Sequence, residues 1–363
     1  MKIVKILTIT LLLSLNSSCQ EKSADTMETQ EKIPKAWEEM GNSPLEYPAE
    51  VYQGGLEQRD VNGEVLNYRG LNHGLITGPW GSKGGGMSRS WFVPTHINCI
   101  WLSYAEHTFY KINVAIDHDK MLRLFQEGYP DSLAFLNYGE REKSYFHSII
   151  TGFAPGGVVV IWLAGGGRQV EIGRYKGVKY EIDAEEIAGL EQEIHVIFEQ
   201  EFREAILSDS IVIPLEVQKA NKNKPIPYGL WDSYRTRYSW RPVFEVQKEG
   251  IFESAYFEMI NGEKEQLFDQ TLINNIFVKR ALPQLINLGW RDKQGQKYGG
   301  KIIFDEEEMR NAFSEIYKED NTVEAELHFV INQMNSFVTA ILQQGDKKIR
   351  LPKTKVNVYK ASE

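Results

Sequence analysis

Two segments of the chain hold the side chains best suited to binding or catalysis. Glu106 and His107 place a carboxylate beside an imidazole at the expected tip of a hairpin, a common location for a binding group. Trp231 and Trp240, with two tyrosines between them, can stack on sugar rings if they are exposed. Each pair also has a structural alternative, which is a solvated turn for the first pair and core packing for the second.

The sequence contains no recognised catalytic or metal-binding motif. The glycine-rich segment 81–86 lacks the spacing of a phosphate-binding loop, and no helical pattern follows it. His195 has Glu191 and Glu199 one helical turn away, but no third metal ligand is evident. We therefore expect no catalytic residues, no metal and no cofactor, and the pattern favours a protein that is not an enzyme.

The composition is that of a soluble globular protein, with 42% hydrophobic and 25% charged residues. The formal net charge is -9, and an acidic surface repels phosphate backbones. A nucleic-acid partner is therefore not expected. Of the two cysteines, Cys19 is the expected site of lipid attachment. Cys99 aligns with Leu288 when the two copies of the internal repeat described below are compared. A disulfide is therefore not expected either.

The first 18 residues have the pattern of a lipoprotein signal peptide. A basic start with Lys2 and Lys5 precedes an apolar stretch from Ile6 to Leu15, which is too short to span a bilayer. Small residues then lead to Cys19, a sequence that resembles the bacterial lipobox. We expect a lipid on the Cys19 thiol, which would anchor the chain in a membrane. Residues 19–35 are polar and aperiodic, and indicate a disordered tether.

The later sequence repeats part of the earlier sequence. Pro94, Ile97, Asn98 and Trp101 recur as Pro283, Ile286, Asn287 and Trp290, and further matches follow in the same order. Each copy shows alternating apolar residues typical of strands and one short amphipathic helix. Between the copies, apolar residues at three- and four-residue spacing predict one long helix from Ala184 to Leu207.

These patterns predict an α+β fold made of two tandem, duplicated, mainly antiparallel β units, each with a short helix. We expect the first unit at residues 36–183 and the second at residues 235–361. A long amphipathic helix and a linker would join them over residues 184–234.

Three segments resemble an uncharacterised family of bacterial lipoproteins, a domain of unknown function. They are Trp101-x-Ser-x-x-Glu-x-x-x-Tyr110, Gly152-Phe-Ala-Pro-Gly-Gly157 and Trp80-Gly81, and the resemblance covers about residues 36–182. It implies a location in the cell envelope and no assigned catalysis, and it suggests an immunity role. Acidic residues after Cys19, at Glu21 and Asp25, also resemble export signals of surface lipoproteins in Bacteroidota-type bacteria.

We therefore expect an outer-membrane lipoprotein of a Gram-negative bacterium that is held by its lipid anchor and is not enzymatic. The acidic residues after Cys19 favour exposure on the cell surface. A protein partner, as for an immunity protein, is the first hypothesis. A surface glycan, bound through Trp231 or Trp240, is the second. A hydrolase whose acidic residues meet only in the folded chain is the third.

Overall fold

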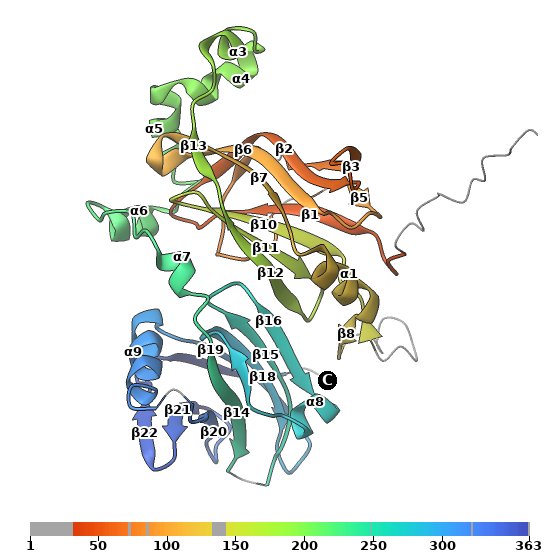
Figure 1. The fold of residues 1–363 in the computed structure, drawn as a ribbon. Coiled ribbons are helices and arrows are strands. Elements are labelled where there is room, and N and C mark those ends of the chain that lie inside the picture. Colours follow the sequence, from red (N-terminus) through yellow and green to blue (C-terminus); the bar gives the residue numbers. More distant parts are fainter. Residues whose placement is uncertain are drawn as a thin grey trace, which may run out of the picture. The chain divides into compact units, whose positions relative to one another are not determined.

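The computed structural model describes residues 32–71, 74–84, 86, 88–132, 143–247, 249–320 and 322–361. Residues 1–31 lie outside this part, so the predicted signal peptide, Cys19 and most of the predicted tether are not described. From Lys32 onward the chain forms one unit. Its strands fall into a first half, β1 to β13, and a second half, β14 to β23 (Figure 1), and short helices connect β13 to β14 along the chain.

The first half is built from two sheets that share one apolar core. One sheet contains β1 (Trp37–Asn42), β5 (Arg89–Ser90), β10 (Ser148–Ala154), β11 (Val158–Ala164) and β12 (Gln169–Lys176). The other contains β2 (Ala49–Arg59), β3 (Val65–Gly70), β4 (Leu75–Ile76), β6 (His96–Ser103), β7 (Thr108–Ala115) and β13 (Val178–Tyr180). Helix α1 (His118–Glu127) follows β7, and a short pair, β8 (Tyr129–Pro130) and β9 (Lys143–Ser144), precedes β10.

Strands β10 and β11 are buried on both faces, which explains their nearly continuous apolar sequences. One face, with Ile149, Val159 and Ile161, packs into the core of the first half. The opposite face, with Val160 and Trp162, packs into the core that contains the second half. The two halves therefore share apolar contacts across this part of the sheet.

The second half also contains two sheets. The first holds β15 (Ile251–Met259), β16 (Lys264–Phe268), β18 (Pro283–Arg291), β19 (Lys297–Ile303) and β23 (Lys355–Lys360). The second holds β14 (Tyr238–Val246), β17 (Val278–Arg280), β20 (Ala325–Ile331), β21 (Val338–Gln344) and β22 (Lys347–Arg350). Helix α8 (Asp269–Ile273) follows β16, and helix α9 (Glu306–Ile316) follows β19.

A ten-stranded sheet runs through both halves in the order β23-β19-β18-β15-β16-β12-β11-β10-β1-β5. The two halves meet where β12 pairs with β16, at Gln169 opposite Lys264. The order of hydrogen-bonded strands is similar in the two halves. Strand for strand, the order β13-β7-β6-β2-β3 in the first half corresponds to β23-β19-β18-β15-β16 in the second. Strand β1 also pairs in parallel with β10, as β14 does with β20.

The predicted fold class is wrong. The chain is mostly β, with 45% of its residues in strands and 19% in helices, and large sheets take the place of two α+β units on a long helix. Strands β14 and β15, although consecutive in the chain, do not form a hairpin, because β14 pairs with β17 and β20 while β15 belongs to the other sheet.

The predicted helix from Ala184 to Leu207 is broken into short pieces. They are α3 (Ala184–Ala188), α4 (Gln192–His195), a 3-10 turn (Val196–Phe198) and α5 (Gln200–Ser208). Glu191 and Glu199 adopt extended backbone angles, with ψ of 147° and 129°, and each interrupts the helical path. Of the described side chains in these pieces, only Ile197 is buried, so tertiary packing does not hold one continuous helix together. Every helix in the described part is too short or too polar to cross a membrane.

Candidate ligand-binding cavity

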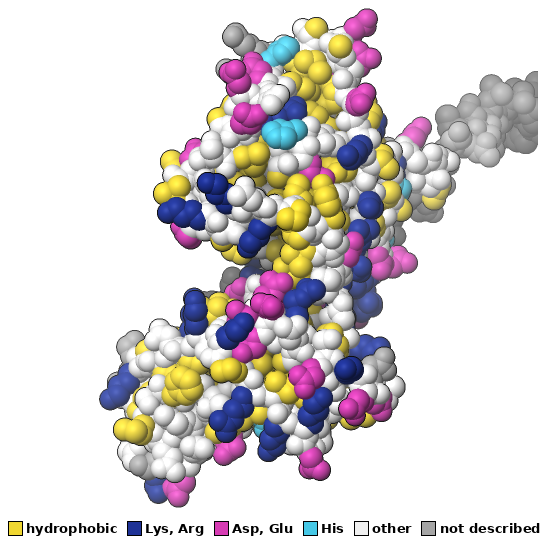
Figure 2. Space-filling view, turned by 90° about the vertical axis from the view of Figure 1, so that its left-hand side faces the viewer, with side chains coloured by type: hydrophobic (Ala, Val, Ile, Leu, Met, Phe, Trp, Pro, Cys, Tyr) yellow, Lys and Arg dark blue, Asp and Glu magenta, His cyan; other side chains and the backbone are white. Residues whose placement is uncertain are grey.

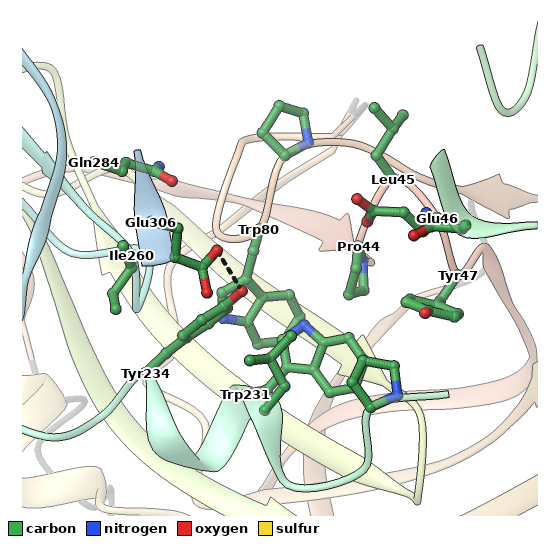
Figure 3. A pocket seen from close by; sticks show the side chains of 14 residues that line it. Pro44, Leu45, Glu46, Tyr47, Trp80, Trp231, Tyr234, Ile260, Gln284 and Glu306 are labelled. Atoms are coloured by element: carbon green, nitrogen blue, oxygen red, sulfur yellow. Dashed lines mark hydrogen bonds between the residues drawn. The ribbon is translucent and has the colours of Figure 1, made fainter. Parts of the chain in front are cut away.

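A cavity of about 380 Å³ lies where the two halves meet the segment that connects them (Figure 3). The first half contributes residues 44–47 and the Pro79–Trp80 turn. The connecting segment contributes α7 (Leu230–Ser233), and the second half contributes the start of α9. The described residues that line it are Pro44, Leu45, Glu46, Tyr47, Pro79, Trp80, Asn221, Pro227, Leu230, Trp231, Tyr234, Ile260, Gln284 and Glu306.

Helix α7 is fixed to both halves, and this positions Trp231 in the cavity wall. The Arg174 guanidinium, on β12, donates two hydrogen bonds to the Asp232 carboxylate at 2.6 and 2.8 Å. Such bidentate pairs define orientation as well as distance. On the other side, Arg310 of α9 donates to the Ser233 hydroxyl at 2.8 Å. Because Asp232 and Ser233 directly follow Trp231, these contacts restrain its indole.

The aromatic side chains of the cavity meet at steep angles. The Tyr47 and Trp231 rings lie 5.5 Å apart at 89°, and the Trp80 and Trp231 rings lie 6.5 Å apart at 60°. Trp80 packs in turn on the buried Trp162, at 5.0 Å and 79°. Edge-to-face packing of this kind fixes the rings and forms corners in place of a flat stack.

The ionisable groups of the cavity are two glutamates and two tyrosines. Tyr234 donates to Glu306 Oε2 at 3.0 Å. Burial, followed by the charge of Glu306, raises the pKa of Tyr234, so its phenol stays protonated and remains a donor. Glu46 enters the wall from the first half, and Figure 3 shows it across the cavity from Glu306. None of the described lining residues is a lysine, an arginine or a histidine.

Glu106, one of the residues predicted from the sequence, lies outside the cavity and is surrounded by hydrogen-bond donors. Its carboxylate accepts from Ser103 Oγ at 2.9 Å, Tyr110 OH at 2.8 Å and the Gly156 backbone N–H at 3.0 Å. A fourth bond, at 3.0 Å, comes from Tyr228 OH in the segment that leads to α7. The Glu106 carboxylate therefore joins residues 103–110 to residues 152–157, which are separate motifs in the sequence.

His107 is exposed and adopts a left-handed backbone conformation, with φ of 48°, at the end of the 3-10 turn Tyr104–Glu106. Its carbonyl accepts a hydrogen bond from Arg203 at 3.2 Å. Glu106 and His107 are neighbours in the chain, but no described hydrogen bond joins their side chains. The geometry gives them no shared catalytic arrangement.

The four aromatic residues proposed from the sequence separate into two groups. Trp231 and Tyr234 line the cavity. Trp240 has no exposed surface; its indole N–H donates to the Ala281 carbonyl at 3.3 Å, and Arg280 lies over its ring. Tyr238 packs on the α9 side chains Phe313 and Tyr317. Core packing therefore accounts for Trp240 and Tyr238, and neither is available to stack on a sugar.

The other candidates have structural roles. The thiol of Cys99 is free and buried on β6, and burial raises its pKa, as expected for an apolar filler. In the glycine-rich segment, the Gly81 N–H donates to Asn42 and its carbonyl accepts from Gln169. Within the described residues, no group of three or more His, Cys, Asp or Glu side chains is placed to hold a metal ion.

Sequence reasoning missed most of the cavity. Glu46, Tyr47, Gln284 and Glu306 carried no recognisable local pattern, and Trp80 was noted only beside a glycine. The signal that could have helped is Trp80-Gly81, because the turn that it forms packs on the second half. Residues from six separate segments reach the cavity only when the halves come together.

A protein-family model described as "Protein of unknown function (DUF2931)" matches residues 22–229, more than half of the chain. The chain belongs to this family. The match extends beyond the expected 36–182 and includes Glu106, Trp80 and the 152–157 turn. It ends just before α7 and the second half, so part of the cavity lies beyond it. No curated protein and no solved structure matched the chain.

Proposed function

We propose that the protein is a membrane-anchored lipoprotein of the bacterial envelope that binds a partner protein and does not catalyse a reaction. The cavity around Trp231 is its proposed binding site. The observation that carries the proposal is the wall of this cavity, in which aromatic and proline side chains surround a few polar groups. Walls of this composition are typical of binding pockets.

The polar groups favour binding over nucleophilic catalysis. The described lining residues include no serine, threonine, cysteine, histidine or lysine, so a glutamate or a tyrosine would have to act as nucleophile or base. The remaining ionisable groups are two glutamates and two tyrosines. Glu306 is already an acceptor for Tyr234. A hydrolase acting through Glu46 and Glu306 is the competing interpretation, and it predicts turnover of the bound molecule.

A protein partner suits the wall better than a glycan does. Aromatic rings line the cavity, and extended peptides dock in aromatic-lined grooves. Trp240 is buried and cannot contact a glycan. Trp231 lines the cavity, but only 3% of its surface is exposed. A sugar ring needs an open aromatic face, and Trp231 presents little of one.

The proposed location at a membrane rests on the sequence of residues 1–19. A basic start, a short apolar stretch and small residues before Cys19 support lipidation of that thiol. With the thioether in place, the tether holds the folded chain close to the membrane surface, where an envelope partner would meet it.

Affinity capture from a detergent extract of the envelope tests the proposed binding site. The full-length wild type is compared with Leu45→Arg, which places a long cation in the cavity, and with Leu66→Arg on the exposed strand β3 as a matched control. We expect the wild type and Leu66→Arg to retain the same partner and Leu45→Arg to lose it. Equal capture by all three proteins, or none by the wild type in either low or high salt, would refute the proposal. Cleavage of the captured partner would favour the hydrolase.

A further inference from the structure

We infer that the group entering this cavity carries a positive charge on a short apolar stem, as a lysine side chain of the partner does. The inference rests on the proposed function, since it takes the cavity as the binding site. It adds the chemistry of the ligand, which follows from the charge, the ring geometry and the apolar surface of the wall.

The first argument is charge. Glu46 and Glu306 reach the cavity from the two halves, and its described lining contains no cationic side chain to neutralise them. Arg310 approaches Glu306 only to 3.9 Å, and these side chains are 36% and 46% exposed, which describes a weak surface pair. In the described part of the chain, no ion pair involves Glu46. Lys219 and Lys222 line a neighbouring groove with Glu46, outside the 4.0 Å ion-pair distance.

The chain as a whole is also acidic. The whole chain has a formal charge of -9, and a cleft lined by charges of one sign concentrates counter-ions. Figure 2 shows Asp and Glu side chains, with some Lys and Arg, gathered midway down the face on the side of α6 (Leu215–Asn221) and α9, below a broad hydrophobic strip. An anionic ligand would meet the carboxylates of Glu46 and Glu306, so the wall selects against it.

The second argument is the arrangement of the rings. The Tyr47 and Trp80 rings, which line the cavity, stand at 89° and 60° to the ring of the buried Trp231. Cations bind over aromatic faces, and aromatic corners of this kind are used to hold ammonium groups. Leu45, Leu230 and Ile260 line the same space and would contact the methylene groups of the stem. A lysine side chain supplies both parts.

A titration with two matched peptides tests the inference. The peptides have the sequence Gly-Gly-X-Gly-Gly with blocked ends, where X is lysine or norleucine, so that they share a four-carbon stem and differ in the charged group. Ligand-observed saturation-transfer NMR measures the dissociation constant for the full chain in neutral detergent. We expect the lysine peptide to bind at least about tenfold more tightly, because a charge-assisted hydrogen bond supplies that factor. Its affinity should also fall with added salt.

Single variants locate the effect in the cavity. Glu46→Gln and Glu306→Gln should each weaken the lysine peptide by about tenfold while leaving the norleucine peptide unchanged. Glu307→Gln is the control, because Glu307 is the exposed neighbour of Glu306 on α9 and does not line the cavity. Circular dichroism confirms that each variant is folded. Unchanged lysine binding in both cavity variants would overturn the inference.

Other outcomes separate the inference from the proposed function. Equal affinity for lysine and norleucine, combined with loss of the partner in Leu45→Arg, would reject the cationic ligand and leave the binding site standing. Equal peptide affinities with an unaffected Leu45→Arg would reject both. Binding of a neutral chitin oligosaccharide that is insensitive to Glu46→Gln and Glu306→Gln would also overturn the cationic ligand and favour a glycan.

Discussion

The backbones of Gly81 and Gly262 are in direct contact across the junction of the two halves. A Cβ atom on Gly81 would lie 2.4 Å from the Gly262 Cα, a separation that real side chains do not show. Both glycines have positive φ angles, 76° and 86°. Gln169 binds the pair from one side, because its side-chain amide donates to both carbonyls, at 2.7 and 2.6 Å. The junction therefore depends on two residues without side chains.

Alanine at Gly262 should destabilise the protein more than alanine at Gly63. Both glycines sit in an Asn-Gly-Glu turn with a φ of 86°, so the backbone strain is matched. Gly63 has open space around it, whereas a Cβ on Gly262 would lie 2.9 Å from the Gly81 Cα. We expect Gly262→Ala to lower the free energy of unfolding by about 1–3 kcal/mol more than Gly63→Ala does. Urea denaturation measures the difference, and equal losses would show that the contact is unimportant.

Glu106→Gln should destabilise the first half although the shape of the side chain is preserved. Oε1 accepts from Tyr110 and Tyr228 and Oε2 accepts from Ser103 and Gly156, so a glutamine would lose the charge in all four bonds and would require at least one hydroxyl to turn and accept. We expect a loss of about 1–3 kcal/mol in the free energy of unfolding. Tyr228→Phe removes one donor and should cost about 1 kcal/mol or less. A Glu106→Gln protein that unfolds at the wild-type denaturant concentration would contradict this prediction.

The stability of the chain should fall in acid partly through Glu263 and Glu265. Burial alone would raise the pKa of each carboxyl group, but bonds from Arg237 to Glu263 and from Arg280 to Glu265 lower both below the ordinary 4.5. A lowered folded-state pKa stabilises the protein above about pH 4.5, and this stabilisation is lost as the pH falls through the folded-state value.

Glutamine variants at these two positions check the acid prediction. Glu263→Gln and Glu265→Gln should be less stable at neutral pH and should show a shallower fall in acid than the wild type. Urea denaturation at several pH values gives the comparison. Glu216→Gln, on the exposed surface of α6, is the control and should follow the wild-type curve. Parallel curves for all four proteins would exclude these ion pairs as the source of the acid dependence.

Counting reactive thiols tests the predicted lipid on Cys19. The chain has two cysteines, and burial with a raised pKa should protect Cys99 from a thiol reagent in the native state. If Cys19 carries a thioether, protein purified from membranes should show no reactive thiol when native and one after denaturation. One reactive thiol in the native protein and two after denaturation would mean that Cys19 is free.

Local sequence patterns predicted the elements that depend on local interactions. Asp117 and Asp305 each accept a backbone N–H at the start of a helix, α1 or α9, as capping rules require. Four residues further along each helix, apolar side chains are buried at Met121 and Met309. Alternation and continuous apolar runs likewise located β6, β10 and β11. These features are determined by neighbours within a few residues of each other.

Features formed by distant segments were not predictable in this way. The pairing of Gln169 with Lys264 joins two sheets into one, and neither strand carries a local sign of its partner. Glu46 and Glu306 are isolated carboxylates in the sequence, and their common cavity depends on the junction of the halves. Apolar residues do recur at helical spacing around Ile194 and Phe198, but this spacing did not reveal the residues with extended backbone that interrupt the helix.

The ten-stranded sheet sets a limit on where the chain can be divided. The family match ends at residue 229, yet Ile150, Val160 and Trp162 of the first half pack in the same core as residues of the second. A shortened chain that stops at this boundary would expose those side chains and lose the pairing of Gln169 with Lys264. Such a fragment should aggregate, because it lacks the second half, which covers these apolar side chains in the full chain.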